Sequence, residues 1–159
     1  MRPVTQLLVL VAVLALGCSA AAQARTVTVT HGVVPAPAYL DGGDPGPSAG
    51  DVRVFQFAGA SDGVDVQLDV LMTTTSSGTP DAGLERRITK LVFTFADPAD
   101  QIIVEGVARY PLEGATIELG NSVVRPVIGG SGIYPGASGQ AVSTQAADGT
   151  WTHVLHLES

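Results

Sequence analysis

Apolar and polar residues alternate along most of the chain after residue 25, the pattern of a β-strand with one buried face. In residues 64–72 (VDVQLDVLM), every second residue is apolar and those between are mostly polar. Comparable runs cover residues 26–31, 51–57, 88–95, 101–109, 115–118, 123–128, 139–145 and 150–157. No stretch keeps a helical period, so the pattern predicts an all-β protein.

Strands at this spacing predict an antiparallel sandwich or a closed barrel. We favour an eight-stranded antiparallel closed β-barrel, because closure removes the exposed edges of a small sheet protein. Asp97–Asp100 and the pair Asp148-Gly149 are expected to form tight turns between strands. Residues 35–50 (PAPAYLDGGDPGPSAG) are rich in proline and glycine and predict a surface loop within one domain, residues 25–159.

The first 24 residues have the features of a signal peptide. Arg2 precedes the apolar run 7–16 (LLVLVAVLAL), and residues 22–24 (AQA) offer a cleavage site. The run is short for a bilayer span, which needs about 20 apolar residues, so we expect a secreted or periplasmic protein without a stable membrane span. Residues 15–18 (ALGC) resemble a lipobox, which leaves open a lipoprotein anchored through Cys18.

Composition excludes several classes of function. Fifteen acidic residues against eight basic ones give a net charge of -7, whereas a nucleic-acid partner requires a basic surface. After cleavage at residue 24 no cysteine remains, which excludes a disulfide, a thiol nucleophile and a cysteine-bound zinc ion. We expect neither a cofactor nor a metal.

Three segments carry a family resemblance. Residues 128–140 (IGGSGIYPGASGQ) resemble the glycine-rich segment of plant allene oxide cyclases and are similar to that of plant dirigent proteins. Residues 102–106 (IIVEG) resemble the strand before that segment, and residues 36–40 (APAYL) resemble the segment after the first cyclase strand. The resemblance implies an eight-stranded barrel around a hydrophobic cavity and allows a homo-oligomer, a dimer or a trimer. Thr28 falls where the cyclases carry a catalytic glutamate, so their own activity does not transfer.

The glycines of residues 129–132 have a structural interpretation. They permit positive φ angles and close backbone approach where one strand ends and the next begins. A phosphate-binding loop would need a following helix, and the sequence predicts none there.

His153 is the first candidate for acid–base chemistry. It shares a strand face with Trp151 and Leu155, whereas His156 lies on the opposite face. The two histidines are therefore not expected to bind a metal together. An imidazole in an apolar cavity can act as acid or base near neutral pH, although a hydrogen-bonded core histidine fits the same pattern.

Glu105 and Tyr110 are the other candidates. The Glu105 carboxylate could polarise a carbonyl, act as a base, or pair with Arg109 on the same strand face. The Tyr110 phenol could donate a hydrogen bond to a carbonyl or epoxide oxygen.

Three functions remain open at this point. The first is a cofactor-independent cyclase or isomerase that folds an apolar, oxygenated small molecule inside the barrel. The second is a lipocalin-like protein that binds such a molecule without converting it. The third is an interaction protein with a filled interior. Acid–base groups converging on a cavity favour the first function.

Overall fold

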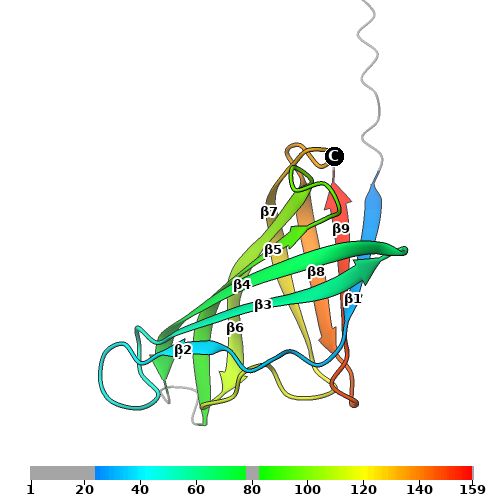
Figure 1. Cartoon of the computed structure of the whole chain (residues 1–159). Helices are drawn as coiled ribbons and strands as arrows, with labels where there is room; N and C mark the ends of the chain where they lie inside the picture. The colour runs from blue at the N-terminus through cyan, green and yellow to red at the C-terminus, as the bar shows by residue number, and fades with distance from the viewer. Residues whose placement is uncertain (1–23, 78–82, 159) are drawn as a thin grey trace, which may run out of the picture.

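The computed structural model describes residues 24–77 and 83–158, which form one continuous antiparallel sheet (Figure 1). The predicted signal peptide, including Cys18, falls outside the described residues apart from residue 24. The strands are β1 (Arg25–His31), β2 (Ala38–Leu40), β3 (Val52–Ser61), β4 (Val64–Ser77), β5 (Leu84–Thr94), β6 (Gln101–Pro111), β7 (Ser122–Ser131), β8 (Ser138–Gln145) and β9 (Trp151–Glu158).

The sheet closes into an eight-stranded barrel, which confirms the predicted fold. Neighbours in sequence pair from β2 through to β9, β9 pairs with β1, and β1 returns to β3 through Thr30 and Ala60. The short β2 pairs with the other end of β3, at residues 52–54. Strands β1 and β2 therefore share one position in the wall, and residues 55–59 of β3 have no partner strand on that side.

Alternation places the apolar side chains inside the barrel. On β4, Val66, Leu68, Val70 and Met72 are buried as predicted, while Val64 at the strand start is 42 % exposed. Burying a side chain such as Leu68 contributes about 1.5–3 kcal/mol to stability. The core therefore follows from the period of two.

Three local predictions were wrong. Residues 115–118 lie in a loop instead of a strand, and the 35–50 loop contains β2. The last hairpin is wider than two residues: the Ala146 N–H donates to the Thr150 carbonyl, and Gly149 supplies the left-handed conformation at φ 84°.

Among the described residues, no helix is long and apolar enough to cross a membrane.

The glycine-rich segment closes the β7–β8 hairpin, in agreement with its structural interpretation. Gly132 has φ 61° and packs so closely on the 97–100 turn that a Cβ would meet Ala99 O at 2.7 Å. Asp100 accepts a hydrogen bond from the Ile133 N–H at 2.9 Å. Tyr134 is buried against Phe95 at this end of the barrel.

Candidate functional site

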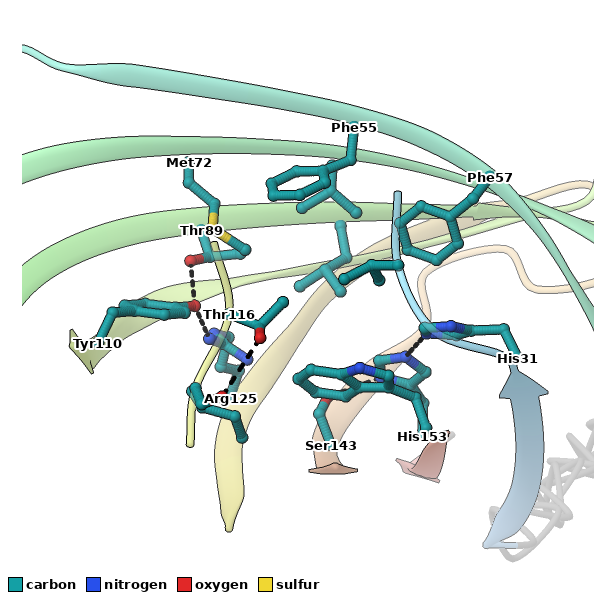
Figure 2. A pocket seen from close by; sticks show the side chains of 15 residues that line it. His31, Phe55, Phe57, Met72, Thr89, Tyr110, Thr116, Arg125, Ser143 and His153 are labelled. Carbon is teal, nitrogen blue, oxygen red and sulfur yellow. Dashed lines mark hydrogen bonds between the residues drawn. The ribbon is translucent and has the colours of Figure 1, made fainter. Parts of the chain in front are cut away.

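A small cavity lies inside the barrel, and the unpaired stretch of β3 contributes Phe55 and Phe57 to its wall. Its volume is about 40 Å³, room for about three water molecules. Fifteen side chains line it, and just over half are apolar (Figure 2). The half-buried lining residues are His31, Val34, Phe57 and Thr116. The polar lining residues are His31, Thr89, Tyr110, Thr116, Arg125, Ser143 and His153.

Ser143, His153 and His31 form a hydrogen-bonded chain on one side of this cavity (Figure 2). Ser143 Oγ lies 2.8 Å from His153 Nδ1, and His153 Nε2 lies 3.0 Å from His31 Nε2. His31 Nδ1 lies 2.7 Å from the carbonyl of Gly32, which can only accept. This carbonyl sets both tautomers. His31 Nδ1–H donates to Gly32, His153 Nε2–H donates to His31, and Ser143 O–H donates to His153.

Both imidazoles are held neutral by their surroundings. Burial, with the nearby His31 and Arg125, lowers the pKa of His153 to about 3. Burial also lowers the pKa of His31, an effect that its hydrogen bond to Gly32 partly offsets. The Trp151 ring stacks on His153 with centroids 5.7 Å apart, and Phe93 meets the same ring edge-on. His153 is therefore a rigidly held free base at neutral pH.

Arg125, Tyr110 and Thr89 lie on the other side of the cavity (Figure 2). Arg125 Nη2 donates to the Tyr110 hydroxyl, which lies 2.7 Å from Thr89 Oγ1. Burial lowers the pKa of Arg125, while the hydrogen bond to Tyr110 acts in the opposite direction; arginine nevertheless stays protonated in proteins. No carboxylate of the described residues forms an ion pair with Arg125, and its Nε, although buried, has no partner.

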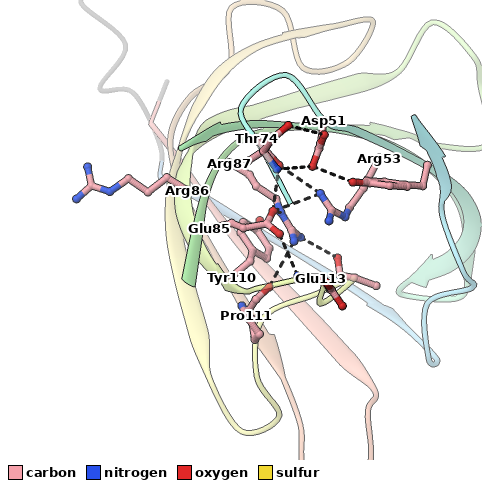
Figure 3. A network of polar contacts seen from close by, with 12 residues as sticks. Asp51, Arg53, Thr74, Glu85, Arg86, Arg87, Tyr110, Pro111 and Glu113 are labelled. Atoms are coloured by element: carbon pink, nitrogen blue, oxygen red, sulfur yellow. Dashed lines mark hydrogen bonds and ion pairs between the residues drawn. The ribbon is translucent and has the colours of Figure 1, made fainter. Parts of the chain in front are cut away.

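A second buried polar cluster closes one end of the barrel next to the 41–50 loop (Figure 3). Glu85 Oε2 accepts from Arg87 Nε at 2.9 Å, from Thr74 Oγ1 at 3.0 Å and from Arg53 Nη1 at 3.4 Å. Its Oε1 accepts from the Glu113 N–H at 3.0 Å. Burial alone would raise the pKa of Glu85, but these hydrogen bonds and the two arginine charges lower it.

The same cluster anchors the proline- and glycine-rich loop. Asp51 is fully buried and accepts from the Tyr39 hydroxyl at 2.8 Å and from the backbone N–H groups of Ser48 and Gly42 at 2.9 and 3.1 Å. These bonds outweigh the effect of burial and lower the pKa of Asp51. We assign this cluster a structural role, because its carboxylates are fully supplied with donors.

The structure brings two of the three predicted site residues to the cavity. His153 and Tyr110 line it from β9 and β6. Glu105 lies on the outer face of β6, where its carboxylate pairs at 3.1 Å with Lys90 on β5. Glu105 does not line the cavity, so the site we describe omits it.

Sequence reasoning missed Arg125, His31 and Ser143. Arg125 shares a strand face with Val123 and Val127, the same signal that singled out His153. His31 follows Val27 and Val29 on the inward face of β1, and its contact with β9 depends on barrel closure. Ser143 is a small polar residue on a short strand, and nothing in its neighbourhood marks it.

The fold and the cavity define a class: a closed antiparallel β-barrel with an apolar core and a small cavity lined by both apolar and polar side chains. Among solved structures, pyocyanin demethylase matches this chain with a TM-score of 0.61 and 21 % identity, covering 85 % of this chain and 99 % of that protein. At that identity the likeness shows a shared barrel fold. No family model matches the chain, and no curated protein is similar to it in sequence.

Among residues 24–77 and 83–158, no group of three or more histidine, cysteine, aspartate or glutamate side chains could hold a metal ion.

Proposed function

We propose that the barrel binds an apolar, oxygenated small molecule and converts it by cofactor-independent cyclisation or isomerisation, with a proton moved along Ser143, His153 and His31. The observation that carries this proposal is the hydrogen-bonded chain that ends at the wall of an apolar-lined cavity. The fold neighbour is named for an activity on a small molecule, pyocyanin. The glycine-segment resemblance to allene oxide cyclases and dirigent proteins supports the same class of function.

The chain of hydrogen bonds explains how a buried imidazole of low pKa can still take part in proton transfer. A charge left on His153 at pH 7 would cost about 5 kcal/mol, given its pKa of about 3. If Ser143 Oγ takes a proton from the substrate and passes its own to His153 Nδ1, and His153 passes its Nε2 proton to His31, the positive charge rests on His31 and not on the buried ring. The reverse transfer returns a proton to the rearranged substrate, so the protein is left unchanged. His31 is half-buried, and its Nδ1–H already donates to a carbonyl that stabilises a cation.

A ligand larger than a few water molecules needs more room than the cavity of about 40 Å³ provides, since drug-sized ligands occupy about 300–1,000 Å³. The additional room would come from the half-buried side of the cavity, where Val34 and Phe57 lie. Val34 belongs to the connection between β1 and β2 and Phe57 to the unpaired stretch of β3, and both are half-buried. We propose that these two side chains move outward when the ligand enters.

The test is turnover of candidate oxylipin, terpenoid and polyketide epoxides by the purified protein. His153→Gln should lower turnover by about a hundredfold or more, because it removes the group that accepts the proton. His156→Gln is the matched control, since His156 lies on the opposite face of the same strand and is exposed. Equal turnover in wild type and His153→Gln would refute the catalytic proposal. Binding without turnover of any candidate would favour the lipocalin-like function.

Export is a separate proposal that rests on the sequence alone. We expect cleavage after Ala24, and intact-mass analysis of the exported protein measures it. A mature chain that starts at Arg25 supports this expectation, whereas a lipidated Cys18 at the N-terminus supports the lipoprotein alternative. Light scattering of the same sample measures whether the protein is a dimer or a trimer.

A further inference from the structure

Two buried donors in the cavity have no acceptor. Arg125 Nε and Trp151 Nε1 are fully shielded from solvent and lack a hydrogen-bond partner, and both residues line the cavity. They are the only unpartnered buried side-chain polar atoms found in residues 24–77 and 83–158. A buried donor without an acceptor is unfavourable, so a pair of them at one cavity points to an acceptor that enters from outside.

Charge at the cavity points in the same direction. No aspartate or glutamate is among the fifteen lining residues, and both lining histidines are neutral. Arg125 is therefore the one formal charge on the cavity wall, and it is 4 % exposed and hydrogen-bonded to the Tyr110 phenol. Removing a cation from water without a counter-charge is costly. The protein as a whole is acidic, so the positive site is local to this cavity.

We infer that the ligand of this cavity is an apolar carboxylic acid in its anionic form, with the carboxylate at Arg125 and the hydrocarbon part among the apolar lining side chains. This inference rests on the proposed function and specifies its substrate class. The carboxylate satisfies Arg125 Nε and compensates the buried charge, as guanidinium–carboxylate pairs do. Tyr110 holds the guanidinium plane in place through Nη2, and its own hydroxyl is held by Thr89.

The protein carries its own reporter for this inference. Trp151 is the single tryptophan of the chain, so its indole N–H gives one resonance in a proton–nitrogen correlation spectrum. Because Trp151 lines the cavity and its indole N–H has no partner, an occupant of the cavity should shift the resonance. A ligand bound elsewhere on the barrel should leave it in place.

The experiment titrates the purified protein with hexanoate and with hexanamide, which share length and shape and differ in charge. We expect saturable shifts of the Trp151 indole resonance, with hexanoate binding about tenfold or more tightly than hexanamide because of the ionic hydrogen bonds. Arg125→Met should abolish this preference, and Arg125→Lys should retain part of it. Lys90→Met, which removes a cation from the outer face, should leave it unchanged.

Three results would overturn the inference. Equal affinity of wild type for hexanoate and hexanamide would refute recognition of the anion and leave small-molecule binding intact. A hexanoate preference that survives in Arg125→Met would place the anion site elsewhere. No shift with either probe would refute occupancy of this cavity, and the proposed function would fail with it.

Discussion

Two arginines, Arg87 and Arg125, point into the same barrel, but only Arg87 is paired with a carboxylate. Arg87 on β5 is fully buried, bonds to Glu85 through Nε, and reaches the carbonyls of Ala115 and Pro111 at 3.5 Å each. Arg125 on β7 is 4 % exposed and bonds to the Tyr110 phenol, with Nε unpartnered. The Tyr110 ring lies under the Arg87 guanidinium at 4.6 Å, so the two cations are close neighbours in one interior.

The difference separates buried polar groups that serve the fold from those that we propose serve a ligand. The Arg87 cluster satisfies its charges within the chain, which makes it a brace for the end of the barrel and the 41–50 loop (Figure 3). At the cavity, by contrast, the Arg125 guanidinium has no counter-charge and its Nε has no acceptor. An incomplete polar cluster lowers stability, and the proposed binding site gives a physical reason for keeping one.

The largest loss of stability is expected from a substitution in the buried polar cluster around Glu85 and Arg87. Glu85→Gln keeps the shape of the side chain and leaves Arg53 and Arg87 buried without a counter-charge. We expect a loss of about 3–5 kcal/mol in the free energy of unfolding, measured by urea denaturation. A loss below about 1 kcal/mol, within the range of an exposed pair, would show that the cluster is not a brace.

As the pH falls, protonation of the histidines should lower the free energy of unfolding before protonation of the carboxylates does. His153 has a pKa of about 3 in the folded chain and 6.5 when unfolded, so the unfolded state binds more protons between these values. The free energy of unfolding therefore falls as the pH drops below 6.5, by about 1 kcal/mol per pH unit. Glu85 and Asp51, whose folded pKa values are lowered, add their own losses only below their unfolded values of 4.5 and 3.8.

The window from pH 6.5 to 4.5 thus isolates the histidines. Urea denaturation across it should show a reduced slope in His153→Gln and an unchanged slope in His156→Gln. A wild-type stability that is flat in this window would contradict a neutral, buried His153.

The smallest effect is expected on the outer face. Lys90 and Glu105 form an ion pair at 3.1 Å with side chains 48 % and 33 % exposed, and such pairs contribute about 0–1 kcal/mol. Glu105→Gln should change neither the unfolding free energy beyond that range nor turnover by more than about twofold, within the scatter of surface substitutions. A large loss of turnover would return Glu105 to the site.

Much of the fold was predictable because the alternation of apolar and polar residues in each strand indicates which face is buried. The alternation on β4 and β9 predicted which residues face inward, and it placed His153 inside and His156 outside correctly. The 115–118 segment misled because its two apolar residues, Ala115 and Ile117, also fit a loop that packs on the core, as Ile117 does here.

The site was less predictable because it is made by closure. His31 meets His153 only because β1 pairs with β9 across the barrel seam, with Val29 opposite His153. Glu105 was misplaced because alternation alone does not say which face is inward. Its neighbours on that face, Ile103 and Val107, are apolar, yet Val107 is 57 % exposed on the barrel surface.

The most direct test compares Arg87→Met with Arg125→Met in the free energy of unfolding without ligand. Each variant removes one buried guanidinium and keeps an unbranched side chain. We predict that Arg87→Met loses about 3–5 kcal/mol, because Glu85 stays buried without its main partner, whereas Arg125→Met changes by less than about 1 kcal/mol or gains stability. Equal losses of several kcal/mol in both variants would contradict the account, because Arg125 would then be a structural residue like Arg87.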